Sequence, residues 1–545
     1  MKKMMIVVAG VAATLAFVAS AAPKPKALVV MLDGCRADAL ENATAPNIRM
    51  LAEGRWQPGY RAAWTRTACT ILDGPTHSAP NHAAIATGVT AAKTNVRGNG
   101  EFRNCDYSKW PSWLVRLAEA QPDKKALFVY SWKNDALLSP SAKVEAVRGG
   151  DEPNGAMLAK RLAGPDAPDA TLFYIDMPDH AGHTTGYYPY TQNYLRAVRI
   201  SDKLVGGCLK AIASRPSFKD EDWLVIVTAD HGGYAKRHFW TSGHTTTIPL
   251  VVSSMHIAQG ELSGIPFNYD STPTALAHFG IDVSGMGLDG RAVSKESQFI
   301  ATGTPRPLKD GLAAYLAFES PQATNRIKGG PVAEMGGKAK SCEPGGFVRG
   351  HLKLTASTNE TAFVRLAGSE NLKFENGADF SATLWVRMAS AQNGDAPIFG
   401  NKNWSSGRNP GIALIGARRV EASPVPGISL NLGVSGESKR IDSGIYDIDY
   451  GKWVFYAIVR RSDGVLMFYQ GGADGRLYWI AEDAKNMRLD SGLPFCIGQD
   501  GTGCYKHQFN GDIDDFALWT RALSHDDVRR IFESGRQGIP LAELL

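Results

Sequence analysis

Up to about residue 294, short apolar runs alternate with segments whose apolar residues recur at helical spacing, and this alternation restricts the fold more than any other feature. The runs expected to form buried strands are 27–32, 127–130, 171–175, 224–228 and 248–253. One long segment gathers its apolar residues on a single helical face, formed by Tyr194, Val198, Val205, Leu209 and Ile212. The pattern predicts an α/β domain with a mainly parallel sheet and helices on both faces.

The sequence changes character beyond a polar stretch at 298–309, which contains two prolines and indicates a linker. Strand-like runs follow at 382–388, 453–460, 465–470 and 476–480. Asp463-Gly464 and Asp474-Gly475 lie between such runs and favour tight hairpins, because glycine accepts a positive φ. We therefore expect an α/β domain at 24–297 and an all-β jelly-roll sandwich at 310–540.

The first 21 residues have the pattern of a secretory signal peptide. Lys2 and Lys3 precede an apolar run at 4–18, and Ala19-Ser20-Ala21 supplies the small residues that signal peptidase accepts. An N-terminal membrane anchor is the alternative, but the run is short for a span. We expect a secreted or periplasmic protein that has no membrane span after cleavage and begins near Ala22.

Charge and cysteine content narrow the partners and the redox chemistry. The chain has 59 basic and 54 acidic residues, and this small, dispersed excess argues against a nucleic-acid partner. Its seven cysteines would permit disulfides in an exported protein. Cys496 and Cys504 flank a Gly-rich turn and are the expected pair, and the odd count leaves at least one thiol unpaired within the chain.

Acidic and imidazole side chains follow the predicted strands at the points where the strands end. In open α/β sheets, ligands bind beyond the carboxyl ends of the strands. Each residue alone has an ordinary interpretation as a helix cap or a turn former, but the combination of carboxylate and imidazole suits a pair of Zn²⁺-like ions. The six candidate ligands are Asp33, Asp179, His183, Asp230, His231 and His244.

In order and spacing these residues resemble the two-metal site of the alkaline phosphatase superfamily. The superfamily uses an Asp after the first strand, an Asp with a His four residues later, an Asp-His pair and a downstream His. The resemblance covers roughly 27–293 and implies one metal on Asp179, His183 and His244. It implies a second metal on Asp33, Asp230, His231 and the nucleophile. Two divalent ions, Zn²⁺ by the ligand types, are thus the expected cofactors.

The expected nucleophile is Ser78, in a stretch that resembles the nucleotide pyrophosphatase/phosphodiesterase branch. In that branch a Thr attacks, followed by an aromatic residue, Pro, Asn and His; here Ser78 stands at the Thr position and Ala79 at the aromatic one. We expect Ser78 to be the N-cap of a helix, where the helix dipole and a nearby cation both favour its alkoxide. Thr76 is the alternative nucleophile. The missing aromatic puts nucleotide specificity in doubt.

Two further residues bear on the choice of substrate. Asn99 matches a family Asn that holds a phosphoryl oxygen, or else it is a turn residue beside two glycines. Lys133 matches half of a Lys-x-Arg element of monoesterases, or else it is a solvated lysine. Asp135 stands where the Arg would be. Without that guanidinium a monoester dianion loses a bidentate partner, which favours diesters.

The sequence after 310 resembles laminin-G-like, concanavalin-A-like jelly rolls. The resemblance rests on a strand at 512–519, followed by a helix that begins at Ser524 with Asp527 three residues later. It implies a glycan or cell-surface ligand for this domain. The aromatics Trp453, Phe455 and Trp479 are expected in the core rather than in a sugar site.

Taken together, the sequence predicts an exported, metal-dependent phosphoric ester hydrolase, a phosphodiesterase or phosphomonoesterase that acts through a seryl-phosphate. Two alternatives stay open. One is a sulfatase, which Ser78-x-Pro80 and the 33–54 region also resemble, although Asn81 and His82 break the sulfatase motif. The other is a glycan-binding or adhesive protein whose catalytic domain is a relic.

Overall fold

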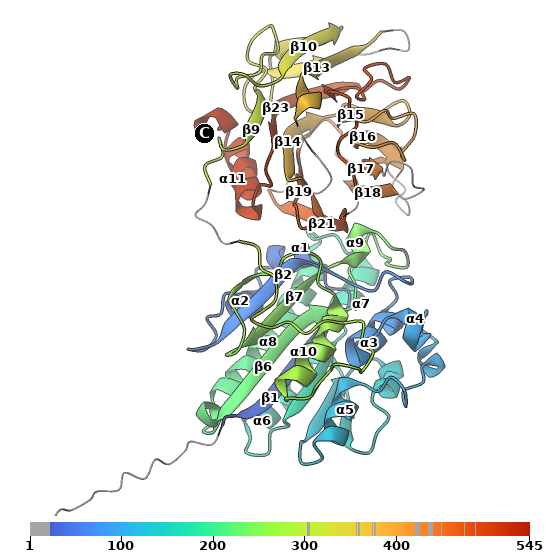
Figure 1. Ribbon diagram of the computed structural model, residues 1–545, viewed down its shortest axis with the longest axis vertical. Coiled ribbons are helices and arrows are strands. Elements are labelled where there is room, and N and C mark those ends of the chain that lie inside the picture. The colour runs from blue at the N-terminus through green and yellow to red at the C-terminus, as the bar shows by residue number, and fades with distance from the viewer. Residues whose placement is uncertain are drawn as a thin grey trace, which may run out of the picture.

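The computed structural model describes residues 22–301 and 306–545, except for 356, 358–359, 373, 375–377, 420–425, 434–439, 448–449, 473–474 and 486. The predicted signal peptide at 1–21, part of the predicted linker and Asp474 lie outside the described residues. Figure 1 shows an α/β domain and a β-sandwich that lie against each other. In the described part of the chain, no helix combines the length and the apolarity that a membrane crossing requires.

The α/β domain is built on one eight-stranded sheet whose order is β4-β3-β5-β1-β6-β7-β2-β8. The neighbours from β4 to β6 pair in parallel, whereas β7 pairs antiparallel with both β6 and β2. The strand bounds are β1 Lys24–Leu32, β2 Arg61–Cys69, β3 Ala126–Tyr130, β4 Val144–Arg148, β5 Ala170–Ile175, β6 Glu221–Ala229, β7 Thr247–Ser254 and β8 Gly260–Glu261. β1 is central, and it is fully buried from Ala27 onward because helices cover the sheet on both faces.

The helices form two groups, one for each face of the sheet. One group consists of α1 Ala37–Asn42, α2 Pro46–Ala52, α6 Asp151–Ala163 and α7 Met177–Thr185, all of which contact α8 Gln192–Ala213. The other consists of α3 Ser78–Thr87, α4 Ala91–Thr94, α5 Trp113–Ala120 and α10 Ser271–His278. A short α9, Gly243–Thr246, lies directly before β7. The helical face predicted from Tyr194 to Ile212 is buried, as expected.

The second domain is an antiparallel sandwich of two sheets with the orders β10-β13-β22-β15-β16-β17-β18 and β11-β12-β23-β14-β19-β20-β21. The bounds of the first sheet are β10 Val332–Gly337, β13 Ala362–Ala367, β22 Phe495–Ile497, β15 Ala396–Gly400, β16 Ile412–Arg419, β17 Pro426–Gly433 and β18 Arg440–Asp447. Those of the second are β11 Lys340–Glu343, β12 His351–Leu354, β23 Gly511–Trp519, β14 Phe380–Arg387, β19 Trp453–Arg460, β20 Val465–Gly471 and β21 Leu477–Asp483. β9, Leu312–Leu316, pairs with β23. One apolar cluster fills the space between the sheets.

Two local predictions for this domain are confirmed. Asp463-Gly464 closes the β19–β20 hairpin with Gly464 at φ +92°, a value that suits glycine. The last helix, α11 His525–Arg536, has Ser524 as N-cap, and Asp527 completes a capping box. A second apolar cluster forms where α11 covers the outer face of the second sheet. It buries Phe455 and Trp479, which are core residues as expected, whereas Trp453 is only partly buried against the same cluster.

The predicted disulfide between Cys496 and Cys504 is wrong. All seven cysteines are free, with Cys496 buried in β22 and Cys504 exposed. The turn between them is closed instead by Asp500, whose Oδ1 accepts hydrogen bonds from the backbone of Thr502 and Gly503 at 3.0 and 3.1 Å. The Asp500 carboxylate thus closes this turn through hydrogen bonds, without a disulfide.

Candidate metal centre

The candidate ligands gather at the carboxyl ends of three adjacent strands, β5, β1 and β6. Asp33 follows β1, Asp230 follows β6, and Asp179 lies in the first turn of α7, just beyond β5. The backbone N–H of Asp33 donates to Ile175 O at 2.9 Å, which fixes the end of β1 against the end of β5. Parallel pairing therefore delivers carboxylates from three distant parts of the sequence to one place.

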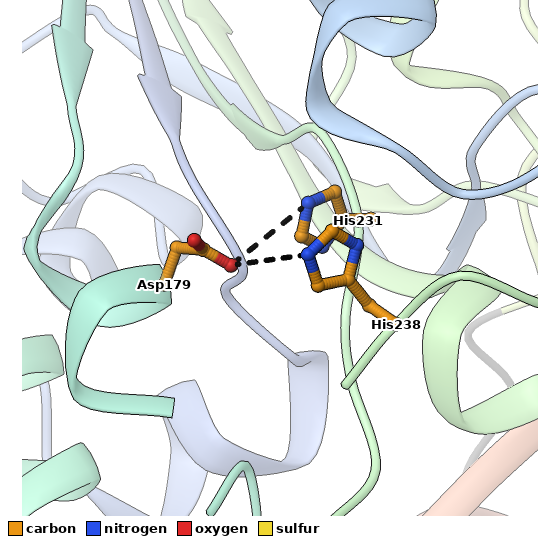
Figure 2. A group of neighbouring side chains, drawn as sticks. All are labelled: Asp179, His231 and His238. Carbon is orange, nitrogen blue, oxygen red and sulfur yellow. Dashed lines mark ion pairs between the residues drawn. The ribbon is translucent and has the colours of Figure 1, made fainter. Parts of the chain in front are cut away.

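The first group of side chains consists of Asp179, His183 and His238. Asp179 and His183 lie one turn apart on α7, and His183 Nε2 is 3.4 Å from Asp179 Oδ2. His238 Nε2 lies 3.1 Å from His183 Nε2 and 3.8 Å from Asp179 Oδ1. Figure 2 shows the Asp179 carboxylate facing His238 and the neighbouring His231. The side chain of His183 is 39% exposed, so this group opens to solvent.

The second group consists of Ser78, Asp33, Asp230 and His231, and the first three all lie close to the Nε2 atom of His231. His231 Nε2 is 3.2 Å from Ser78 Oγ, 3.2 Å from Asp230 Oδ2 and 3.4 Å from Asp33 Oδ1. The same nitrogen is 4.0 Å from Asp179 Oδ1, so His231 lies between the two groups. Asp33 Oδ1 is buried and has no hydrogen-bond partner among the described residues.

All three histidines present the same nitrogen to the site. The Nδ1 atoms of His183, His231 and His238 lie 2.9, 2.7 and 2.6 Å from the backbone carbonyls of Lys236, Gly232 and Thr76. A carbonyl only accepts, so Nδ1 carries the proton and Nε2 carries the lone pair. His183 Nε2 and His238 Nε2 thus face each other at 3.1 Å as two acceptors. A cation between them satisfies both, and this arrangement fits divalent metal ions.

The electrostatics of the groups agree with that fit. Burial lowers the pKa of His238 to about 3 and lowers that of His231 well below its usual range, so both rings are neutral. Burial also raises the pKa of Asp179 to about 8 and raises those of Asp33 and Asp230. Uncharged imidazoles beside carboxylates that resist ionisation form a site that is stabilised when positive charge enters.

The candidate set from the sequence needs one revision, because His238 rather than His244 joins Asp179 and His183. His244 Nδ1 lies 3.2 Å from Arg36 Nη1, and its ring packs 4.7 Å from that of Tyr234. Among the described residues, the tightest acid–imidazole groups are Asp179–His231–His238 and Asp33–His82–Asp230, and neither contains His183 or His244. His183 adjoins the first of them, with Nε2 at 3.1 Å from His238 Nε2 and 3.4 Å from Asp179 Oδ2. In the sequence, both His238 and His244 follow the Asp230–His231 pair, so the order of the motifs fits either one. The path of the chain after His231 decides which of them reaches Asp179 and His183.

The structure adds His82 and Asp135, which sequence reasoning did not assign to the site. His82 lies one helical turn after Ser78 and is fully buried, with Nε2 at 3.1 Å from Asp230 Oδ2 and 3.3 Å from Asp33 Oδ2. Its Nδ1 lies 2.9 Å from Asp135 Oδ1. Burial alone would lower the pKa of His82, but the surrounding carboxylates, Asp135 foremost, raise it well above its usual range. The i, i+4 spacing from Ser78 was the available signal.

The two candidate nucleophiles have different surroundings. Ser78 is the first residue of α3 with His77 as N-cap, one position from the expected cap, and its Oγ faces His231. Thr76 is fully buried, and its Oγ1 contacts the carbonyls of His238 and Trp240. Thr76 therefore ties the loop that carries His238 to the start of α3, and Ser78 is the hydroxyl that faces the metal groups.

The two predicted substrate-binding residues also differ in placement. Asn99 Oδ1 accepts from the backbone N–H of Ala79 at 3.1 Å, so this amide lies beside Ser78. Lys133 is exposed at the start of the 3₁₀ segment η2, Lys133–Leu138, and no contact with the metal groups is recorded for it among the described residues. Asp135 in the same segment reaches the site instead, through His82.

Two family models match the chain, one in each domain. Residues 27–122 and 129–235 match type I phosphodiesterase / nucleotide pyrophosphatase, and residues 358–529 match the concanavalin A-like lectin/glucanases superfamily. These matches bear out the resemblances to the nucleotide pyrophosphatase/phosphodiesterase branch and to concanavalin-A-like domains that were drawn from the sequence. The first match supports an ester hydrolase. No curated protein matches this sequence.

Solved structures of three kinds are similar to parts of the chain. A sulfatase described as putative, from Bacteroides thetaiotaomicron, shares 14% identity over 63% of this chain and 82% of its own, with a TM-score of 0.42. Murine ectonucleotide pyrophosphatase/phosphodiesterase 5 shares 12% over 48% and 96%, with a TM-score of 0.36. The binding domain of Paraclostridial Mosquitocidal Protein 1 shares 17% over 42% and 53%, with a TM-score of 0.33.

Proposed function

Starting from an N-terminal domain of the type I phosphodiesterase / nucleotide pyrophosphatase kind, we propose that this protein is an exported, metal-dependent phosphoric ester hydrolase that acts through a seryl-phosphate. The observation that carries the proposal is the convergence of three imidazole lone pairs and three carboxylates beside the Ser78 hydroxyl. Two metals would be held, one by Asp179, His183 and His238 and the other by Asp33, Asp230, His231 and Ser78.

The divalent ions, Zn²⁺ by the donor set, would supply Lewis acidity for the serine hydroxyl and for the leaving oxygen. Ser78 Oγ attacks phosphorus in line, so that the Oγ–P bond forms as the bond from phosphorus to the ester oxygen breaks. The proton of Ser78 Oγ leaves with the ester oxygen as the alcohol. A water molecule then attacks phosphorus from the opposite side, so that a new O–P bond forms as the Oγ–P bond breaks and a proton of the water returns to Ser78 Oγ. The product is phosphate from a monoester or a phosphomonoester from a diester. His82 and Asp135 hold Asp33 and Asp230 in place throughout.

Asn99 and the first turn of α3 would hold the phosphoryl oxygens. The N–H of Ala79, now bonded to Asn99, points from the helix N-terminus beside Ser78, where backbone donors favour an anion. Asp135 is engaged with His82, so a carboxylate rather than a guanidinium occupies this side of the site. The arrangement favours phosphodiesters over the dianions of monoesters.

Replacement of Ser78 by Ala tests the proposal. We expect turnover of bis-p-nitrophenyl phosphate to fall by roughly 10³-fold or more while two zinc ions per chain remain bound. Thr76→Ser, which keeps its hydroxyl, is the matched control and should retain most activity. Undiminished turnover in Ser78→Ala would exclude Ser78 as the nucleophile. If the wild type hydrolyses an aryl sulfate faster than bis-p-nitrophenyl phosphate and faster than an aryl phosphate monoester, a sulfatase is favoured.

The concanavalin-A-like match supports a glycan or cell-surface ligand for the sandwich. Phe455 and Trp479 are 1% exposed and so are unable to provide a stacking surface. A glycan array probed with the full-length protein tests this part, and binding to no glycan would count against it. A chain that binds a glycan but neither zinc nor any ester would support the relic alternative.

A further inference from the structure

The loop between β6 and α9, residues 230–242, which we call the ligand loop, carries His231 and His238 and also packs into the sandwich. Tyr234 is 1% exposed and belongs to the buried cluster between the two sandwich sheets, as do Tyr478 and Ile480 of β21. Ala235 and Trp240 of the ligand loop pack against the same cluster. One face of the loop thus contributes to the metal groups, and its apolar side chains join the core of the other domain.

A chain of buried hydrogen bonds runs from β21 to the ligand loop. The backbone N–H of Trp479 donates to Asp38 Oδ2 at 3.4 Å, and the Asp38 carboxylate accepts from Arg36 Nε and Nη2 at 2.8 and 2.6 Å. Arg36 Nη1 donates to Gly233 O at 2.8 Å, two residues beyond His231. Arg36 and Asp38 are each 1% exposed, so this path is shielded from water and is sensitive to geometry.

The far end of the ligand loop is held by β21 as well. Gly243 N donates to Glu482 Oε1 at 2.9 Å, and a Cβ at Gly243 would lie 2.8 Å from that oxygen and 3.0 Å from Ile480 Cβ. Just beyond α9, Thr247 Oγ1 donates to Ala481 O at 3.2 Å and accepts from Ala481 N at 2.9 Å. A side chain at position 243 would therefore displace the flexible Glu482 carboxylate and would press on Ile480.

The segment that follows α7 makes a third link between the metal groups and the sandwich. Tyr187 N donates to Ala235 O at 2.7 Å, and the Tyr187 hydroxyl donates to Asp179. Three residues later, Tyr190 O accepts from Arg476 Nη1 at 3.4 Å. Figure 1 shows β21 at the bottom of the sandwich, beside α9. Both elements that bear ligands of the first group are therefore braced by the sandwich.

We propose that the sandwich is a positioning element for the metal centre, and that docking of β21 holds the ligand loop in the conformation that points His231 and His238 at the carboxylates. The inference rests on the proposed function for the ligand role of those histidines, whereas the bracing contacts stand without it. Preorganisation of this kind raises metal affinity because the loop need not be ordered on binding. The sandwich then has a structural role in the metal centre that does not depend on glycan binding.

Hydrogen exchange of the full-length, metal-free protein tests the inference without relying on activity. We expect amides 231–242 to exchange roughly 10-fold faster in Gly243→Ala, whose methyl group displaces the Glu482 carboxylate and presses on Ile480, and in Glu482→Ala, which removes the acceptor without adding bulk. Asp463→Ala is the control, because Asp463 Oδ2 joins Ser263 and Gly264 elsewhere in the same domain contact and should leave the ligand loop unchanged.

Unchanged exchange in Glu482→Ala overturns the inference, and this variant decides alone if Gly243→Ala does not fold. An equal increase in Asp463→Ala also overturns it, because general loosening of the two domains would then be the cause. Zinc titration of the same proteins separates this inference from the proposed function. A looser loop with roughly 10-fold weaker zinc binding supports both. A looser loop in a chain that never binds zinc supports only the bracing of the loop by β21 and contradicts the metal centre and the hydrolase, whereas a looser loop with unchanged zinc affinity contradicts the positioning role alone.

Discussion

At the scale of single residues, backbone carbonyls decide which nitrogen each site histidine offers. The carbonyls of Lys236, Gly232 and Thr76 fix the Nδ1 protons, and three lone pairs converge as a result. His244 lacks this arrangement in the site because its Nδ1 faces Arg36. The contrast between His238 and His244 therefore predicts different consequences for two substitutions in one short segment.

Substitution of His238 should remove one metal, whereas substitution of His244 should not. We expect His238→Ala to weaken zinc binding at one of two sites by more than roughly 100-fold, a larger loss than changes beyond the direct ligands usually cause. His244→Ala should retain two zinc ions per chain. Metal content after gel filtration against a weak chelator measures this. If His244→Ala loses a zinc ion and His238→Ala does not, His244 is the third ligand beside Asp179 and His183, as the sequence predicted.

Asp135 is expected to act on the metal centre through His82. Asp135→Asn keeps the shape of the side chain but removes the charge that holds His82 against Asp33 and Asp230. We expect roughly 10-fold lower zinc affinity at the second site, because partners of ligands orient them. Competition with a fluorescent zinc chelator gives the affinity. Lys133→Ala, in the same segment but exposed, is the control and should match the wild type.

Most of the candidate site could be predicted from the sequence because strand ends and i, i+4 spacing are local signals. Asp33, the Asp179–His183 pair and the Asp230–His231 pair needed only a parallel sheet to meet. His238 depends on the path of a loop, which no local pattern encodes. His82 had a local signal in its i, i+4 spacing from Ser78, but its contacts with Asp33 and Asp230 depend on the tertiary fold. The sequence shows Asp135 at the position of the Arg in a Lys-x-Arg element, but its hydrogen bond to His82 is a tertiary contact that the sequence does not reveal.

At the scale of elements, β23 shows how a strand accommodates buried acids. Its pairing with β14 shifts register between Thr383 and Trp385, and Asp515 has φ +47°, so the strand bulges there. Burial raises the pKa of Asp514 to about 7 and that of Asp515 to about 6. The sequence predicted this strand and the helix after it, but the bulge depends on pairing with β14 and was not foreseen.

Asp514 should make stability fall as pH rises. Its folded pKa lies above the ordinary value near 4, so the folded chain holds a proton that the unfolded chain releases between pH 4 and about 7. The stabilisation is complete below pH 4, declines through pH 7 and is absent above it. It amounts to a few kcal/mol at about 1.4 kcal/mol per pKa unit.

Urea unfolding at pH 5 and pH 8 measures this effect. We expect Asp514→Asn, which has no proton to release, to lose less stability between the two pH values than the wild type. The exposed Asp526→Asn on α11 should behave like the wild type. Parallel curves for all three proteins would show that Asp514 does not titrate in this range.

At the scale of the whole molecule, the two domains share buried contacts rather than only a linker. Apart from the ligand loop, Glu41 of α1 pairs with His525 and Arg529 of α11, and Asp463 bonds Ser263 and Gly264. Domain contacts of this extent couple unfolding. We expect calorimetry of the full chain to give one cooperative transition. Two separated transitions would show that the domains unfold independently.

The position of β21 has a consequence for self-association of the sandwich. β21 is the outermost strand of its sheet, and the backbone groups of Trp479 and Ala481 that no other strand satisfies are bonded by Asp38 and Thr247. An uncovered edge of this kind is a template for adding strands from other molecules. The α/β domain thus covers the edge strand β21, and we expect the isolated sandwich, in which this edge is exposed, to self-associate.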